Sequence, residues 1–341
     1  MKQKQKITKW SEGSAYNALQ DIAIGFQKSQ ILFTAVKYDI FTQINEGKNT
    51  AELIAANSNL NNKAIEKLLN ALVSMKLLDK HTIYYENSPI SKKHLVKTSE
   101  DYYGFILHNA DLWSSWGTLP EVVKTGINVA NTPIYEKDDK FIEDFLLAWD
   151  WRVKLELEVV LKETPLKGVK RFLKIGAYSY RHVLEIAKLH PEIEFTVIDF
   201  PSIIAAAEKL SLKEYDCTNI KFVPFDYINN DFEKGFDLVF VDSIIDEHSI
   251  LENISMIKKV YDAINKGGKL IAYRLLINDS RTEPLAAAFA SINLMLNTPA
   301  GDSYTYSDIW VVLKEAGFKE IDFYRTEAET HIIIASKSLL G

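Results

Sequence analysis

The sequence predicts an α/β fold in which a mostly parallel sheet of seven strands follows a mostly helical region. Residues 172–199 have the pattern of a strand, a helix and a second strand: an apolar run ends at Gly176, a helix-period segment stops before Pro191, and another apolar run ends at Asp199. Similar apolar runs alternate with helical segments over the remaining chain, which is typical of a sheet covered on both faces. The candidate strands are Arg171–Ile175, Glu194–Ile198, Ile220–Val223, Phe236–Val241, Lys269–Tyr273, Glu320–Tyr324 and His331–Ser336.

The connection between the last two candidate strands is short, residues 325–330. Parallel neighbours need a long crossover, whereas antiparallel neighbours need only a turn. We therefore expect an antiparallel pair at the end of an otherwise parallel sheet.

Composition limits the class of protein. A chain of 341 residues can form two domains, and 47% apolar with 25% charged residues is ordinary for a soluble globular protein. A formal charge of −6 argues against a nucleic acid as the main partner. The single Cys217 excludes a disulfide framework and suits a reducing cytoplasm. No apolar run approaches the roughly 20 residues of a membrane span, and no signal-peptide apolar region follows the basic first residues.

Residues 1–100 read as a separate domain. A helix-period stretch, 14–46, has an apolar face too wide for one small core, including Ile22, Phe26 and Ile31, so we expect it to meet either the other domain or a second subunit. Two short helices follow, capped at Asn49 or Thr50 and at Asn61, and then residues 81–86 alternate like a strand. Helix, helix and strand form a winged-helix pattern. DNA binding and dimerisation are both compatible with it, and the lack of a basic stripe favours dimerisation.

Residues 101–166 form an aromatic-rich, mostly helical connecting segment, and 167–341 form the α/β domain. Aromatic side chains at helical spacing usually belong to a core. Ligand pockets also form preferentially between domains, so we expect some of these aromatics to line a substrate pocket, without assigning which. The seven histidines are scattered, and we expect no metal site.

Several motifs in the α/β part have a chemical meaning. The turn at Gly176 offers backbone N–H groups at a helix N-terminus, and Asp199, at the end of the next strand, could accept ribose hydroxyls. Phe225-Asp226-Tyr227 ends the third strand, Asn265-Lys-Gly-Gly-Lys precedes the fifth, and Glu-Ala-Gly-Phe318 ends the last helix. Together with Phe26-Gln-Lys-Ser-Gln-Ile-Leu-Phe, they resemble the class I S-adenosylmethionine-dependent small-molecule O-methyltransferases with an N-terminal winged-helix dimerisation domain.

This resemblance covers residues 14–337. It implies a Rossmann-like seven-stranded methyltransferase domain, S-adenosylmethionine as cofactor, a small-molecule substrate, and a homodimer formed through the N-terminal helices. The positions that match the family's cofactor-binding motifs are Gly176, Tyr178, Tyr180, Asp199, Phe200, Asp226 and Tyr227. Three of its signature residues differ, because Lys174 stands at the family's acid and Tyr178 and Tyr180 stand at its second and third glycines.

The catalytic positions differ as well. The family's general-base histidine aligns with Asp246, the glutamate that orients it with Arg274, and a second glutamate with Ser303. One reading is that Asp246 faces Arg274, which would lower the pKa of Asp246 and make it a weaker base and a better binder of a polar substrate. His248 is two residues away and within reach of the base position. The alternative is that Asp246 only caps a solvated helix. The catalytic candidates are therefore Asp246, His248 and Arg274.

Three functions remain open. The first is methyl transfer to a hydroxyl of an aromatic or polyketide-like metabolite, favoured by Asp199 and Asp226. The second is a rearrangement, cyclisation or decarboxylation that does not use S-adenosylmethionine, and the third is a non-catalytic dimerisation partner or ligand sensor. The replacements at Lys174, Tyr178 and Tyr180 favour these two alternatives. Methyl transfer is the leading hypothesis.

Overall fold

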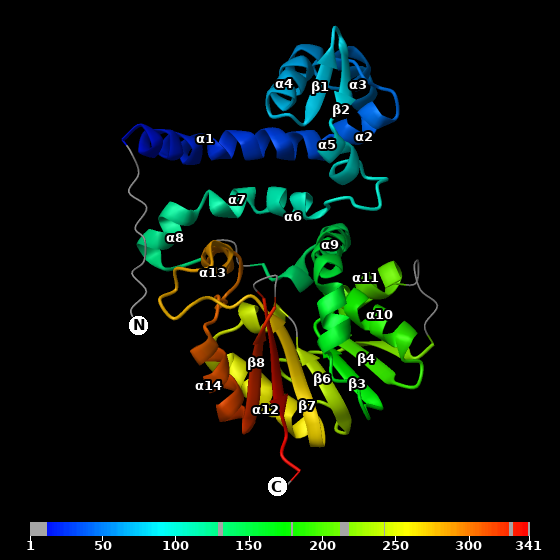
Figure 1. Cartoon of the computed structure of the whole chain (residues 1–341), viewed down its shortest axis with the longest axis vertical. Helices are drawn as coiled ribbons and strands as arrows, with labels where there is room; N and C mark the ends of the chain where they lie inside the picture. The colour runs from blue at the N-terminus through cyan, green and yellow to red at the C-terminus, as the bar shows by residue number, and fades with distance from the viewer. Residues whose placement is uncertain are drawn as a thin grey trace. The chain divides into compact units, whose positions relative to one another are not determined.

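The structure, a computed structural model, describes residues 12–128, 132–178, 180–211, 218–241, 243–326 and 330–339. Cys217 lies outside these ranges. The chain divides into two compact units, residues 1–110 and 111–341, so the expected connecting segment 101–166 is split between them. The boundary falls within a short helix, α6 (Figure 1).

The first unit is mostly helical. Two of its helices begin as the sequence indicates: the side chain of Thr50 accepts a hydrogen bond from the N–H of Leu53, and that of Asn61 from the N–H of Ala64. A positive φ of 55° at Asp39 interrupts the long N-terminal helical stretch. The elements are α1 (Glu12–Lys37), α2 (Ile40–Asn45), α3 (Ala51–Ser58), α4 (Asn62–Ser74), β1 (Leu78–His81), β2 (Tyr84–Asn87), α5 (Pro89–His94) and α6 (Phe105–Asp111).

One expectation for this unit was wrong. Residues 81–86 do not form a single strand but belong to an antiparallel hairpin of β1 and β2, which turns at Thr82 with a φ of 59°. Left-handed backbone at a threonine is uncommon, so the alternating residues gave no sign of the turn. Tyr85 is the residue of β2 that enters the core.

The second unit contains the expected sheet of seven strands, in the order β5-β4-β3-β6-β7-β9-β8. The first five strands of this order are parallel, and β9 pairs antiparallel with both β7 and β8. The strands are β3 (Arg171–Ile175), β4 (Glu194–Asp199), β5 (Ile220–Pro224), β6 (Phe236–Val241), β7 (Ile264–Arg274), β8 (Glu320–Arg325) and β9 (His331–Ser336). The antiparallel pair predicted from the short connection is confirmed.

Helices cover both faces of this sheet. Alternate residues of each strand enter different cores: Phe172 and Phe240 face one side, while Leu173 and Val239 face the other. Helices α9 (Asp139–Glu163), α10 (Tyr180–Leu189) and α11 (Pro201–Ser211) pack on the first side (Figure 1). Helices α12 (Ile250–Ala263) and α14 (Tyr306–Ala316) pack on the second side.

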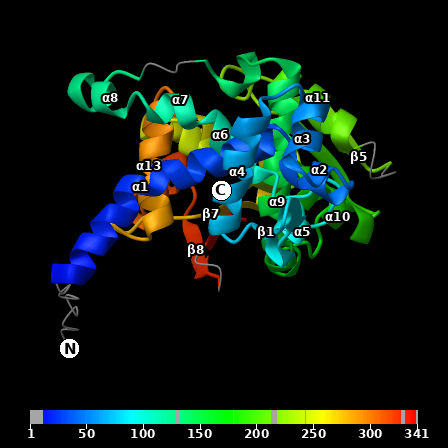
Figure 2. The same cartoon turned by 90° about the horizontal axis from the view of Figure 1, so that it is seen from above.

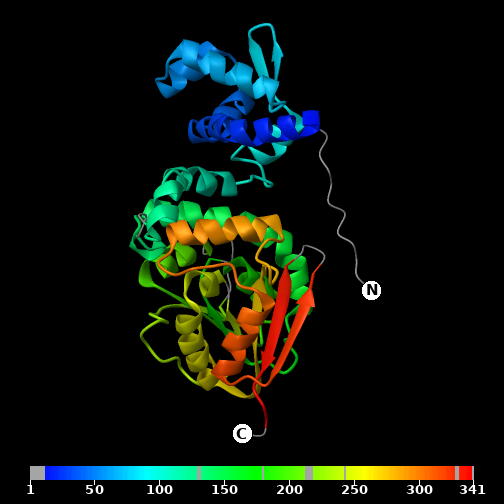
Figure 3. The same ribbon diagram turned by 90° about the vertical axis from the view of Figure 1, so that its left-hand side faces the viewer.

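The remaining elements either precede the sheet in the chain or lie at the carboxyl ends of its strands. They are α7 (Trp113–Trp116), α8 (Leu119–Thr125), the 3-10 helices η1 (Ile134–Glu136) and η2 (Ser243–Glu247), and α13 (Leu285–Asn297). Strand β5 forms one edge of the sheet (Figure 2), and the pair β8 and β9 forms the other end (Figure 3). Among the described helices, none combines the length and the apolar character needed to cross a bilayer.

Candidate functional site

The turn after β3 has the backbone geometry that the sequence predicts. Gly176 has a φ of +90°, which side-chain-bearing residues rarely adopt, and its N–H donates to the carbonyl of Ile198 over 3.0 Å. The next N–H, of Ala177, donates to Oδ2 of Asp199 over 2.8 Å. The turn is therefore joined directly to the end of β4, where Asp199 lies.

Asp199 is almost fully enclosed. It is 1% exposed, and its second carboxylate oxygen accepts the N–H of Phe200 over 2.7 Å. Burial raises the pKa of Asp199 to about 6, although the two N–H donors and the charge of Lys174 oppose this effect. The carboxylate therefore holds the turn instead of facing solvent.

Lys174 lies on the α9–α11 face of the sheet and is 0% exposed. Its ammonium donates to the carbonyl of Gly176 over 2.9 Å and lies 4.7 Å from the centre of the Phe240 ring. A buried ammonium needs such partners because desolvation is costly. Lys174, which stands where the family has an acid, therefore stabilises the turn by a hydrogen bond from inside the protein.

The two tyrosines at the glycine positions have different surroundings. Tyr178 is 4% exposed, and its ring forms a T-shaped pair with that of Phe145 of α9, with the ring centres 5.0 Å apart. Burial and, to a lesser extent, the charge of Glu247 raise the pKa of Tyr178 well above its ordinary value, so the phenol stays protonated. Tyr180, the first residue of α10, is buried in the core beneath α9, α10 and α11.

After the end of β5, the side chains of Asp226 and Tyr227 have different surroundings. Asp226 closes its own turn: its carboxylate accepts the side-chain amide of Asn229 at 2.8 Å and the N–H groups of Ile228 and Asn229, and these bonds lower its pKa. Tyr227 is buried, and burial raises its pKa well above the ordinary value. Its ring lies 5.1 Å from that of Phe200. The Phe200 ring stacks in turn on Tyr135, a residue of η1 that the sequence did not single out, at 4.0 Å.

The segment after β6 carries the catalytic candidates. Asp246, in η2, forms an ion pair with Arg274 at the end of β7, which was one of the readings that the sequence allowed. Arg274 is 3% exposed, whereas the Asp246 side chain is 26% exposed. The backbone carbonyl of Asp246 accepts the N–H of Asp302 over 3.0 Å. Gly301 permits this approach, because a Cβ at that position would lie only 2.3 Å from the same carbonyl oxygen.

His248 points to a different neighbour. Its ring contacts Tyr227 edge-on at 6.2 Å, and burial lowers its pKa, so the imidazole is neutral at pH 7. Its backbone carbonyl accepts the hydroxyl of Tyr304. The side chains of Asp246 and His248 therefore contact different parts of the sheet: Asp246 contacts the end of β7, and His248 contacts the residues that follow β5. Ser303 is committed to structure, since its hydroxyl donates to the carbonyl of Ala287 in α13 over 2.8 Å.

Glu247 follows Asp246 in η2 and was not among the candidate site residues. After the larger effect of burial, its charge contributes to the raised pKa values of Tyr178, Tyr135 and Tyr227. An acid beside Asp246 was visible in the sequence, but its influence on Tyr178, 69 positions earlier in the numbering, was not.

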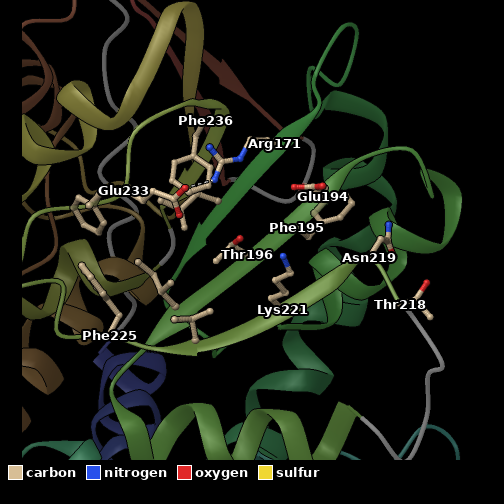
Figure 4. A pocket seen from close by; sticks show the side chains of 14 residues that line it. Arg171, Glu194, Phe195, Thr196, Thr218, Asn219, Lys221, Phe225, Glu233 and Phe236 are labelled. Carbon is tan, nitrogen blue, oxygen red and sulfur yellow. Dashed lines mark hydrogen bonds and ion pairs between the residues drawn. The ribbon is translucent and has the colours of Figure 1, made fainter.

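A hollow of about 700 Å³ lies elsewhere, along the face of β3, β4 and β5 on the α12 and α14 side (Figure 4). Thr196 and Lys221 line it from neighbouring strands, and Arg171 borders it while paired with Glu233 at 2.7 Å. It includes none of the predicted site residues. Within the described ranges, no group of three or more histidine, cysteine, aspartate or glutamate residues is placed to hold a metal ion.

The strand order, the glycine turn after β3 and the acids that end β4 and β5 define a Rossmann-like α/β protein with its candidate site at the carboxyl ends of the strands. A model of the O-methyltransferase domain matches residues 125–319, and a model of the O-methyltransferase dimerisation domain matches residues 20–97. The chain belongs to the O-methyltransferase family.

Individual relatives agree with this assignment. The chain is 24% identical over 309 residues, 89% of both chains, to a 3-hydroxy-5-methyl-1-naphthoate 3-O-methyltransferase of Streptomyces sahachiroi. Its fold is similar to that of human N-acetylserotonin methyltransferase in complex with SAM (TM-score 0.83, 22% identity, covering 97% of this chain and 99% of the other). It is also similar to PigF with SAH (TM-score 0.87, 21% identity, covering 96% and 100%).

S-adenosylmethionine fits the backbone here but not the side chains in this conformation. The turn and the acids stand where a nucleoside would bind in such a fold. However, Asp199 is enclosed and already accepts two backbone N–H groups. An acid that binds ribose hydroxyls must be reachable by them. In this conformation Asp199 is not.

Proposed function

We propose that this protein transfers a methyl group to a hydroxyl of a small aromatic or polyketide-like molecule, with S-adenosylmethionine as the methyl donor. Membership of the O-methyltransferase family supports this, as do relatives named for a hydroxynaphthoate and for tetracenomycin polyketide synthesis. The observation that carries the proposal is the Gly176 turn joined to Asp199, with Asp226 at the end of the next strand. The comparisons favour methyl transfer over a non-methylating reaction.

The candidate residues do not include a strong general base, so we propose that the protein acts mainly by positioning the reacting groups. Asp246 is paired with Arg274, and a carboxylate already paired with a guanidinium binds a proton weakly. The neutral imidazole of His248 faces Tyr227. Holding the reacting groups together can account for a large part of a rate enhancement. We therefore propose that the substrate hydroxyl is acidic enough to lose its proton to water near neutral pH, as in a phenol activated by a carbonyl group.

We also propose that the protein is a homodimer that uses its first helix. Four large apolar side chains of α1 are more than half exposed in the single chain: Tyr16, Leu19, Ile22 and Phe26. Such a row indicates an interaction surface, and it belongs to or borders the region that the dimerisation-domain model matches. Sedimentation velocity at micromolar concentration should show a dimer, and Ile22→Asp should shift it towards the monomer. A monomeric wild-type protein would contradict the proposal.

Calorimetric titration tests the central proposal. We expect S-adenosylhomocysteine, the demethylated product, to bind stoichiometrically, and S-adenosylmethionine to methylate members of a panel of phenols graded in acidity. Activity should rise as the phenol becomes more acidic, until falling nucleophilicity offsets the gain. Absence of binding at millimolar concentrations of both nucleosides would reject methyl transfer.

A further inference from the structure

We propose that the hollow along β3, β4 and β5 (Figure 4) is a second small-molecule site, and that it takes an aromatic anion such as an aromatic carboxylate. The apolar end of the hollow would hold the ring system, and Lys221 would pair with the anionic group. This inference does not rest on the proposed function, because the hollow includes none of the candidate site residues.

The hollow exists because the fold leaves this face of the sheet without a crossover helix. Helices α10 and α11 connect β3, β4 and β5 along the opposite face. The chain then returns past β4 and β3 to β6, and a right-handed crossover places this connection on the face of the hollow. Such a connection usually contains a helix. Residues 225–235, all of them described, contain none, so part of the strand surface stays open.

The walls of the hollow are held in place by contacts within the protein. The guanidinium of Arg171 donates to the carboxylate of Glu233 over 2.7 Å and lies 4.7 Å from the centre of the Phe236 ring. The rings of Phe225 and Phe232 stack with their centres 5.4 Å apart. These contacts join the connection between β5 and β6 to β3. The hollow is therefore formed without a ligand, as small-molecule sites usually are.

The floor of the hollow is apolar at one end and polar at the other. Towards the carboxyl ends of the strands, Val223 is 37% exposed and is the register partner of the buried Ile198. Towards the amino ends, Thr196 and Lys221 are register partners and stand side by side (Figure 4). An apolar surface next to a hydroxyl and an ammonium suits a ligand that has an apolar body and one polar group.

The charges around the hollow favour an anionic group on that ligand. Glu233 is paired with Arg171, and Glu194 is the register partner of Arg171 on β4. Lys221 is exposed, and within the described ranges it forms no hydrogen bond or ion pair. Its ammonium is therefore available to a ligand, and the hydroxyl of Thr196 beside it can donate a hydrogen bond. A volume of about 700 Å³ lies within the range of small-molecule pockets.

Fluorescence titration with anilinonaphthalene sulfonate, an aromatic anion that emits strongly in apolar surroundings, tests the proposal. We expect saturable binding to the wild type. Lys221→Glu should weaken it by at least about tenfold, because attraction becomes repulsion, and Val223→Asp should weaken it similarly by placing a charge on the apolar floor. The matched control is Lys266→Glu, which reverses the charge of an exposed lysine of β7 outside the hollow and should leave the affinity unchanged.

Two results would overturn the proposal. Equal affinity of the wild type, Lys221→Glu and Val223→Asp would mean that the probe binds elsewhere. Equal or tighter binding of naphthylmethylamine, an aromatic cation, would mean that Glu194 and Glu233 determine the charge preference. Circular dichroism verifies the fold of each variant. If a charge-reversed variant does not fold, Lys221→Gln decides the question, with an expected loss of about threefold. None of these outcomes depends on methyl transfer.

Discussion

Asp246 and Glu247 are consecutive residues of η2, yet they are held by opposite sides of the site and by different kinds of contact. Asp246 forms an ion pair with Arg274 at the end of β7, and the guanidinium is 3% exposed. The charge of Glu247 acts instead on the neutral phenol of Tyr178, beside the turn after β3, where it adds to the larger effect of burial in raising the pKa of that phenol. One interaction joins two charges, and the other involves only one.

The difference shows which side of the candidate site is rigid. Removing one member of a buried ion pair leaves an unpaired charge, so the pair resists separation. Losing a neutral phenol leaves a carboxylate that solvent can still reach. We infer that the β7 side is an anchor that sets the position of the segment, while the β3 side is adjustable. The following predictions test this contrast.

The anchor should be the most sensitive point. Asp246→Ala leaves the guanidinium of Arg274 buried without its carboxylate, and should lower the free energy of unfolding by about 3 kcal/mol, the lower end for buried pairs because Asp246 is partly exposed. Urea unfolding measures this change. In the double variant Asp246→Ala with Arg274→Met, most of the loss should be recovered. A single-variant loss below about 1 kcal/mol would mean that the pair is no anchor.

Asp199, on the adjustable side, should give the protein a distinctive pH dependence. Its folded pKa of about 6 lies above the ordinary value of 3.8, so between these values the folded state binds more protons than the unfolded state. This contribution is therefore full below about pH 4, declines as pH rises to 6, and is flat above. The total decline is about 2–3 kcal/mol.

Asp199→Asn tests this directly, because it removes the titration. The unfolding free energy of the variant minus that of the wild type should increase by about 2–3 kcal/mol from pH 4 to pH 6.5. Urea unfolding at several pH values in this range measures the difference. A difference that stays constant over the range would show that Asp199 titrates normally.

Gly301 supports the anchor through close packing. A Cβ there would lie 2.3 Å from both the carbonyl oxygen of Asp246 and Oγ1 of Thr298, so Gly301→Ala should cost about 1–3 kcal/mol of stability. The control is Gly25→Ala in α1, where nothing lies within 4 Å of the new Cβ and a small gain is expected. Equal thermal unfolding of the two variants would contradict the packing argument.

The adjustable contact should have the smallest effect on stability. Tyr178→Phe keeps the ring and removes only the hydroxyl, so we expect a loss of about 1 kcal/mol in chemical unfolding. Adding Glu247→Gln should cost little more, because both changes act on the same interaction. A loss as large as that of Asp246→Ala would abolish the distinction between the anchor and the adjustable side.

The sequence by itself determined most of the architecture. All seven strands lie at the predicted places, the antiparallel end of the sheet follows from residues 325–330, and Thr50 and Asn61 cap the predicted helices. These features depend on periodicity and on hydrogen bonds between near neighbours, which local sequence encodes. The hairpin turn at Thr82 was not predicted, because the turn contains no glycine, asparagine or proline at that position.

Pairing across the site was predictable only in part. The family positions of Asp246 and Arg274 allowed a contact between them as one reading, and they left a solvated helix cap open as the other. The partners of Asp199, Tyr178 and Lys174 were decided by the tertiary structure alone. A polar side chain can bond with many groups of similar chemistry, and only packing at the strand ends determines which one is within reach and shielded from water. The sequence therefore determined the fold of an O-methyltransferase, and the tertiary structure decided that Asp199 is enclosed and bonded to backbone N–H groups.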